Sequence, residues 1–228
     1  MTTPTPPPSR RRLWIVVAVV AAVAIVIAVL LVVPNLRTKV VIGPTPSPTP
    51  TASTATPAAA PSGCLGGSAR DAAMLTSAQQ EASHTTTGAV EVAAAFVRWT
   101  FRHPTPTADE ANQASASIIA STASDSFKNL AASAAANPNP SGGAVADGTD
   151  FYVSTAPGVW YLDRPGKDEV TVSVGAGYVV NGTLNPSLRS SSTFTLVWER
   201  GAWRIQSGSL DHTTEELFRI GTPFSGGC

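Results

Sequence analysis

The chain has 228 residues, which is enough for one or two domains. Its 15 basic and 15 acidic residues cancel, and charged residues make up only 13% of the chain. A nucleic-acid-binding protein needs a basic surplus to neutralise phosphates, so composition excludes that class of partner.

The first feature along the chain is an uncharged apolar run, residues 13–33. As a helix it would span roughly 30 Å, the thickness of the hydrocarbon core of a bilayer. Three arginines at positions 10–12 precede it, and such a cluster favours the cytoplasmic side. We therefore predict a cytoplasmic tail (1–12), one helix that spans the cell membrane (13–33), and an extracytoplasmic remainder. A cleaved signal peptide is the alternative, but the run is longer than the about 7–15 apolar residues of that signal.

A segment rich in Pro and Thr follows the apolar run. Over 43–63 it reads GPTPSPTPTASTATPAAAPSG, which has no apolar bulk to bury. Such composition favours an extended polyproline II stalk and not a packed core. We predict a stalk over 34–63 that holds a folded domain, 64–228, away from the membrane. A flexible linker of unspecified stiffness is the alternative, and the Thr residues are candidates for O-glycosylation.

Two cysteines bracket this predicted domain. Cys64 begins it and Cys228 is the last residue printed. An even number of cysteines outside the cytoplasm indicates a disulfide, which here would stabilise the domain by about 4–5 kcal/mol. An intermolecular bridge and two free thiols are the alternatives. Lipidation of Cys64 is not expected, because a lipidated cysteine lies directly after the apolar run and Cys64 lies about thirty residues beyond it. A zinc site is not expected either, because two cysteines without neighbouring His do not supply its ligands.

Helical patterns predict four helices in the first half of the domain. The second of them carries the sequence GAVEVAAAFVRWTFRHPTP at 88–106, whose apolar residues recur at helical spacing up to Pro104. This helix could be a core element, the lid of a pocket or a docking face, and we expect Phe96, Trp99 and Phe101 to lie mostly in the core. Thr107 and Glu110 form a capping-box pattern before the third helix. The predicted helices are 70–81, 89–102, 108–120 and 126–136, the last capped by Ser124 or Asp125.

Five strands are predicted to follow, at 151–155, 158–162, 169–180, 192–199 and 202–207. The third alternates strictly, with Val170, Val172 and Val174 on one face and Thr171 and Ser173 on the other. The inward sets otherwise comprise Phe194, Leu196, Trp198, Trp203 and Ile205, so no polar side chain is expected to point into the domain. Asn181-Gly182 and Arg200-Gly201 are turn dipeptides. The glycines of GAGYVVNG (175–182) fit a bulge and a turn and not a nucleotide-binding loop.

The sequence offers few candidates for catalysis. His84 lies in a polar loop, and His103 lies at a helix end, where the helix dipole favours a capping imidazolium. Asp211 and His212 are adjacent, but neighbouring residues on a strand face opposite ways, so an acid–base pair is not expected. Asp125 and Asp150 read as a helix cap and a loop residue. No catalytic, nucleotide-binding or zinc-protease motif is present, and we expect no catalytic, cofactor-binding or metal-ligating residue and no cofactor.

Helices followed by an antiparallel meander indicate an α+β domain, with the helices packed on one face of a curved sheet. This order resembles the cystatin-like, nuclear-transport-factor-like cone fold. The most specific element of the likeness is the hairpin LVWERGAWRI at 196–205, and the likeness covers about 88–210. The cone of that fold can hold an enzyme pocket with an Asp or His base.

The layout of tail, anchor and domain also resembles the inner-membrane scaffold proteins of conjugation and type IV secretion systems, of the TcpC and VirB-eight kind. Segments such as FVRWTFRHP (96–104) and PGVWYL (157–162) resemble actinobacterial proteins of this layout. The resemblance implies a non-enzymatic assembly component that contacts the bilayer, other membrane or secretion-channel proteins and further copies of itself. Its docking surface would be the exposed side of 108–136 or the outer face of the sheet. A small-ligand-binding domain, a cone-fold isomerase or dehydratase, and an accessory protein of an Mce-type lipid importer are the alternatives.

Overall fold

Most helices precede the long strands along the folded part of the chain, and the short strand β1 (Arg102–His103) and the helix α7 (Thr214–Ile220) are the exceptions. This order confirms the predicted α+β class. The computed structural model describes residues 59–228, which belong to one compact unit, Ala55–Cys228. None of the helices in this part of the chain has the length and hydrophobicity needed to cross a membrane. The predicted tail (1–12), the predicted transmembrane helix (13–33) and the stalk up to residue 58 lie outside the described residues.

The helical half begins with residues that cap the helices. Thr85 accepts a hydrogen bond from the backbone N–H of Gly88 at 3.1 Å, so the second helix starts at Thr86 and not at residue 89. The predicted capping box of Thr107 and Glu110 is present, with both of its hydrogen bonds. The helices of this half are α2 (Ala72–Glu81), α3 (Thr86–Thr100), α4 (Ala108–Ile118), α5 (Asp125–Lys128) and α6 (Leu130–Ala136).

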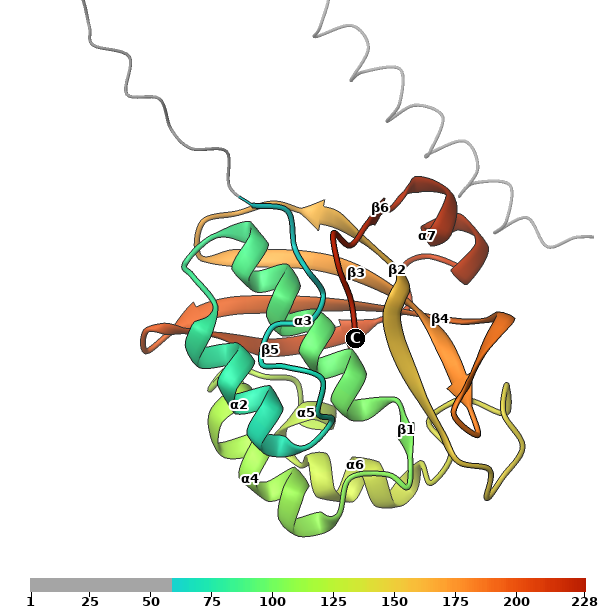
Figure 1. Ribbon diagram of the computed structural model, residues 1–228. Helices are drawn as coiled ribbons and strands as arrows, with labels where there is room; N and C mark the ends of the chain where they lie inside the picture. The colour runs from blue at the N-terminus through green and yellow to red at the C-terminus, as the bar shows by residue number, and fades with distance from the viewer. Residues whose placement is uncertain (1–58) are drawn as a thin grey trace, which may run out of the picture. The chain divides into compact units, whose positions relative to one another are not determined.

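The strands form one antiparallel sheet in the order β1-β2-β3-β4-β5, with β6 paired to β2. The sheet curls into a half-barrel, with α2 and α3 across one face, α4 to α6 gathered at one end and α7 at the other (Figure 1). Both predicted hairpin turns are confirmed, because Asn181, Gly182, Arg200 and Gly201 all have positive φ. The strands are β1 (Arg102–His103), β2 (Phe151–Arg164), β3 (Glu169–Val180), β4 (Thr183–Glu199), β5 (Ala202–Ser209) and β6 (Thr222–Pro223), with α7 (Thr214–Ile220) between the last two.

Strand β2 joins two segments that were predicted as separate strands, 151–155 and 158–162. A register shift between Ser154 and Gly158 accommodates Ala156 and Pro157 as a bulge, and pairing with β3 continues on both sides. Strand β4 likewise begins at Thr183 and not at residue 192, because its pairing with β3 extends to the turn. The short helix α7 was not predicted.

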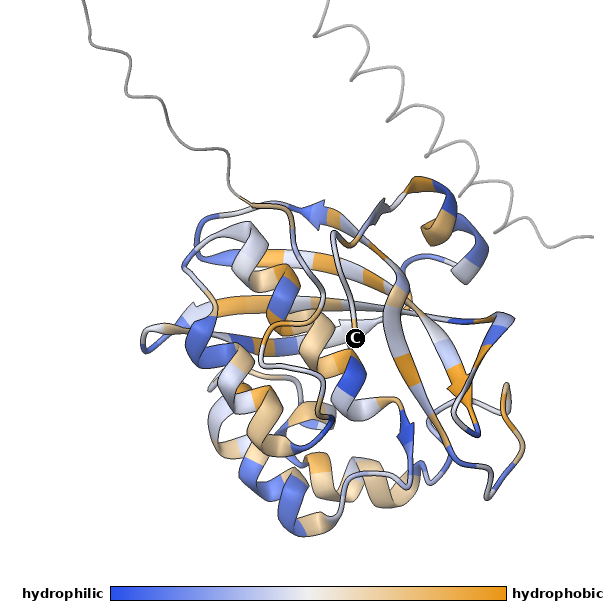
Figure 2. Ribbon diagram, in the orientation of Figure 1, coloured by the Kyte–Doolittle hydropathy of each residue, from blue (hydrophilic) through white to orange (hydrophobic). Residues whose placement is uncertain are grey.

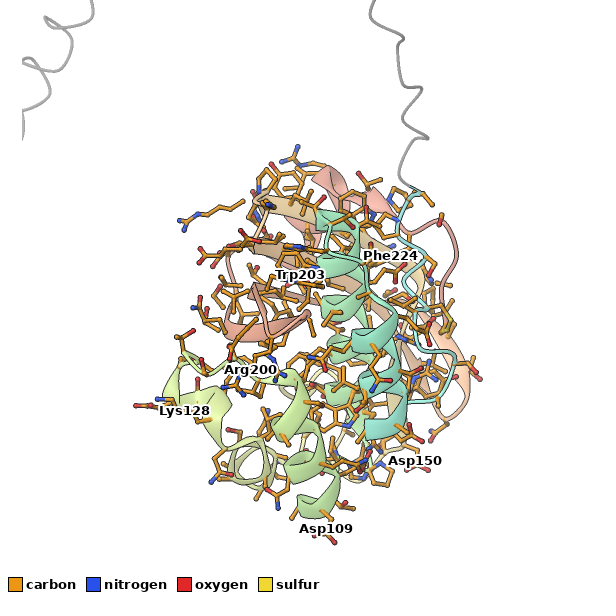
Figure 3. The ribbon with its side chains drawn as sticks, turned by 90° about the vertical axis from the view of Figure 1, so that its left-hand side faces the viewer. Asp109, Lys128, Asp150, Arg200, Trp203 and Phe224 are labelled. Carbon is orange, nitrogen blue, oxygen red and sulfur yellow. A yellow bond between two sulfur atoms is a disulfide. The ribbon has the colours of Figure 1, made fainter. Side chains whose placement is uncertain are left out.

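The core lies between α3 and one face of the sheet. Every residue of α3 from Gly88 to Trp99 is buried, so this helix is a core element, as expected. Val170, Val172 and Val174 are fully buried on the sheet face that was predicted to point inward. Figure 2 shows that the middle of α3 and the central strands are largely hydrophobic, whereas the turns are largely hydrophilic. In Figure 3, Trp203 lies inside the layer of side chains, and Asp109 and Lys128 lie at outer ends of the helical group.

Two charged side chains of α3 are buried with the apolar ones. Glu91 accepts hydrogen bonds from the backbone N–H groups of Ser62 and Gly63, the latter at 3.0 Å. The folded domain therefore includes Ser62 and Gly63, which were predicted to belong to the stalk. An acceptor without a partner at this depth would be costly, so the contact fixes where the incoming chain crosses the helix.

Arg98, about two turns further along α3, is fully buried. It donates to the carbonyl oxygens of Leu65 at 2.8 Å and Gly67 at 2.7 Å. Burial lowers its pKa to about 10, and the neighbouring Arg70 adds to this, so the guanidinium stays charged at neutral pH. Arg98 thus pins the segment that follows Cys64 onto the helix.

A disulfide joins Cys64 to Cys228, with their Cα atoms 5.3 Å apart, which confirms the predicted pairing within one chain. Thr155 holds both ends of the bridge independently. Its hydroxyl donates to the carbonyl of Gly63 at 2.8 Å and accepts the N–H of Cys228 at 3.1 Å. The two ends of the domain are therefore tied together by covalent and non-covalent contacts.

Candidate functional site

A pocket of about 550 Å³ opens between α3, the α5–α6 pair and the ends of β4 and β5. This volume lies within the range of small-molecule sites, about 300–1,000 Å³. Aromatic and other apolar side chains form most of its wall. The lining residues are Phe96, Trp99, Thr100, Phe101, Thr105, Pro106, Ser126, Phe127, Leu130, Ser133, Ala134, Asn137, Pro140, Ser192, Phe194, Gly208, Ser209 and Leu210.

Four aromatic rings make the inner wall. Phe96 of α3 meets Phe194 of β4 edge to face, with ring centroids 5.3 Å apart, and lies 6.1 Å from Phe127 of α5. Trp99 follows one turn later at 5.7 Å from Phe96. Such ring pairs add to the free energy of burial and limit side-chain motion, so this wall is preformed. The aromatic stripe of α3 is therefore both part of the core and one side of the pocket.

The predicted helix 126–136 is broken where it borders the pocket. Asn129 leaves the helical conformation at φ −130° and ψ 77°, and its side chain caps α6 by accepting the N–H of Ala132 at 2.9 Å. Helix α5 therefore ends at Lys128, and Ser124 stands before it without a side-chain capping bond. Phe127 of α5 and Leu130 of α6, on either side of the break, both line the pocket.

The polar groups of the lining are hydroxyls, one side-chain amide and the indole N–H of Trp99. No Asp, Glu, His, Lys, Arg, Cys or Tyr lines the pocket. One serine corrects the expectation that no polar side chain points inward: Ser192 is only 7% exposed, and it shares the core-facing side of β4 with Phe194 and Leu196. The pocket therefore offers an apolar volume with hydrogen-bonding groups and no titratable side chain.

Titratable side chains gather on the other face of the sheet. His212 donates from Nε2–H to Asp163 Oδ1 at 2.6 Å, and its Nδ1 lies 3.5 Å from Glu216 of α7. The second oxygen of Asp163 accepts a hydrogen bond from Ser173 at 2.7 Å. Ser173 alternates with Val172 and Val174, so this cluster and the pocket lie on opposite faces of the sheet. The partner of His212 is thus Asp163 of β2. Its sequence neighbour Asp211 is not its partner, in agreement with the prediction that Asp211 and His212 do not form a pair.

The hydrogen bond to Asp163 raises the pKa of His212 above its ordinary value, with smaller contributions from the Asp163 and Glu216 charges. The ring of Tyr161 meets the imidazole edge to face, at 5.6 Å between centroids. Ser173 is fully buried and its hydroxyl is shared between Asp163 and Thr193, so the serine is not aligned on the histidine as a nucleophile would be. The cluster fastens α7 to the sheet.

The other two histidines have structural surroundings. His84 lies in a loop, as predicted, but its ring stacks on Trp198 at 4.0 Å and its Nε2 lies 2.8 Å from Asp168. His103 does not cap α3, because that helix ends at Thr100 and His103 already belongs to β1, opposite Phe151. Among residues 59–228, no group of three or more His, Cys, Asp or Glu is placed to hold a metal ion.

Comparison with known proteins adds no family to this description. Protein-family models, curated proteins and solved structures give no match to the chain. The functional argument therefore depends on the chemistry of the two sites above.

Proposed function

We propose that this chain is a membrane-anchored, extracytoplasmic protein whose folded domain binds a small apolar molecule without transforming it. The observation that carries the proposal is the pocket of about 550 Å³ between α3, α5–α6 and the sheet. Apolar pockets of this size with a few polar groups are the usual form of small-ligand sites.

The absence of titratable groups from the pocket lining supports binding over catalysis. An isomerase or dehydratase moves protons and needs an acid or base within about 2.6–3.2 Å of its substrate. The Asp163–His212 pair could supply such chemistry, but it lies on the opposite face of the sheet and is occupied in holding α7.

The disulfide supports the extracytoplasmic location, because such bonds persist mainly in oxidising compartments. The uncharged run at 13–33 supports the anchor, and the arginines at 10–12 support a cytoplasmic N-terminus. Helices packed on a curled antiparallel sheet, with a pocket between them, support assignment to the cystatin-like, nuclear-transport-factor-like cone architecture.

The scaffold role in a conjugation or type IV secretion apparatus stays a prediction from the sequence. It requires a docking surface, and the large hydrophobic side chains exposed on residues 59–228 come from three separate segments: Tyr161, Leu184 and Leu210. Leu210 belongs to the pocket. The geometry of the described part of the chain therefore favours a bound molecule over a protein partner.

The test uses the full-length chain in lipid nanodiscs and a small, uncharged carbene-generating probe, with the labelled peptides identified by mass spectrometry. Ala134 of α6 lines the pocket, whereas its neighbour Ala135 is exposed. We expect labelling of the α3 and α5–α6 peptides that falls in the Ala134→Trp variant, because the indole fills the pocket. The Ala135→Trp variant, matched in helix and side chain, retains it. Equal labelling of both variants would overturn the proposal.

A further inference from the structure

Several polar groups of the pocket lining have no hydrogen-bond partner among the described residues. The indole Nε1 of Trp99 and the hydroxyl of Thr100 are buried atoms without one. The hydroxyl of Ser192 also lacks one, and its neighbours on the strand show how unusual this is. Along β4, Ser190 donates to the carbonyl of Ala176 at 3.4 Å, Ser191 to the carbonyl of His212 at 3.2 Å, and Thr193 shares a 2.7 Å bond with Ser173. Ser192 is 7% exposed, about as buried as Ser190, yet its hydroxyl makes no hydrogen bond with the described residues. It faces the pocket.

Buried polar side chains in proteins are almost always hydrogen-bonded, and each exception calls for an explanation. Ser192 lies opposite Val174 in the sheet and shares its face of β4 with Ser190 and Phe194. A bound molecule that presents a hydroxyl or carbonyl group would complete its hydrogen bonding. The apolar wall formed by Phe96, Phe127 and Phe194 would hold the rest of that molecule.

The charge of the bound molecule follows from the lining. An ionised group that enters an apolar site without an opposite charge loses its hydration and gains no ion pair. Every side chain that lines this pocket is uncharged, so a carboxylate, phosphate or ammonium group has no counter-charge there. The pocket should therefore bind a charged amphiphile more weakly than an uncharged one with the same chain length.

From these two observations, and on the basis of the ligand-binding function proposed above, we infer that the pocket holds a neutral amphiphile. It is an uncharged molecule with an apolar body and one hydroxyl or carbonyl group, and that polar group hydrogen-bonds to Ser192. The apolar body lies against the aromatic wall of α3, α5 and β4.

The experiment compares three photoactivatable probes of equal chain length on the full-length chain in nanodiscs: a 1-alkanol, the alkane without its hydroxyl, and the alkanoate. The Ser192→Ala variant removes the hydroxyl alone. One hydrogen bond is worth about fivefold in affinity, so we expect this variant to weaken pocket labelling by the alkanol about fivefold. Labelling by the alkane stays within about twofold, and the alkanoate labels the wild-type pocket least of the three.

Equal losses of alkanol and alkane labelling in Ser192→Ala would overturn the inference, because they would indicate a packing role for the serine. Stronger labelling by the alkanoate than by the alkanol would also overturn it. In either case the pocket is still labelled and the binding function stands. If no probe labels the pocket above the level of the Ala134→Trp variant, the proposed function itself fails. Competition by a neutral glyceride in the nanodisc bilayer, against competition by a short water-soluble alcohol, distinguishes a membrane source of the molecule from an aqueous one.

Discussion

Replacing both cysteines by serine, in the compact unit 55–228, tests how the two ends of the domain stabilise the fold. The bridge closes a loop with a sequence separation of 164 residues between Cys64 and Cys228. On the loop-entropy model this loop length corresponds to about 5 kcal/mol of unfolding free energy. For a domain of this size the loss lowers the melting temperature by roughly 10–20 °C.

The native structure is expected to survive the substitution. Thr155 holds Gly63 and Cys228 through hydrogen bonds that do not need the sulfur atoms, and Arg98 holds the following segment. The loss of stability therefore arises in the unfolded chain, which expands once the bridge is absent.

Urea unfolding followed by circular dichroism measures this effect. We expect the midpoint to fall, the m-value to rise because the uncrosslinked chain exposes more surface, and the near-ultraviolet spectrum of the folded state to be unchanged. The substitution changes no charged side chain, so electrostatic effects do not contribute to the loss of stability. A loss below about 1 kcal/mol, or a changed native spectrum at full secondary structure, would refute the reasoning.

The remaining predictions concern charge, pH and domain boundaries. Arg98→Met leaves the carbonyls of Leu65 and Gly67 without their donor and should cost about 1–3 kcal/mol in urea unfolding, against a smaller loss for Arg98→Lys; equal losses would contradict the role of the guanidinium fork. Because the folded-state pKa of His212 is raised, its contribution to stability is complete below about pH 6.5 and is lost as pH rises through the raised value. The urea midpoint of the wild type should therefore fall as pH rises from about 6.5 through the raised pKa of His212, and it should fall much less in Asp163→Asn. Identical pH profiles would contradict a stabilising His212–Asp163 pair. Deleting 13–33 should release a soluble domain with cooperative unfolding, and recovery only as aggregate would contradict the boundary.

Local patterns in the sequence predicted those parts of the fold that neighbouring residues determine. The alternation of Val170, Val172 and Val174 follows from the two-residue period of a strand, and it identified the buried face of β3. The hairpin turns and the capping box of Thr107 depend on two to four adjacent residues. The pairing of Cys64 and Cys228 followed from there being two cysteines in the chain.

The features that the sequence did not predict depend on distant contacts or on small departures from a pattern. Asp163 and His212 are 49 residues apart in sequence, so nothing near either residue announces the pair. Asn129 interrupts an alanine-rich segment whose helical pattern is otherwise continuous, and the break lies between Phe127 and Leu130, which both line the pocket. Glu91 and Arg98, two charges within an otherwise apolar helix, were a signal that could have indicated the buried anchor points.

The position of Ser192 was missed for a different reason. The stretch SSSTFT at 190–195 has hydroxyl residues on both faces, but the two-residue period counted back from Phe194 places Ser192 on the inward face, a signal that the prediction overlooked. The register of β4 against β3 agrees with this, because Ser192 lies opposite Val174 on the core face.

Native mass spectrometry of the full-length chain, released from nanodiscs prepared directly from the cell membrane, tests the central claim most directly. The account predicts a bound, uncharged small molecule on the wild-type chain and on Ala135→Trp, and its loss from Ala134→Trp, whose indole occupies the pocket. The same bound mass on all three proteins would contradict a ligand in this pocket.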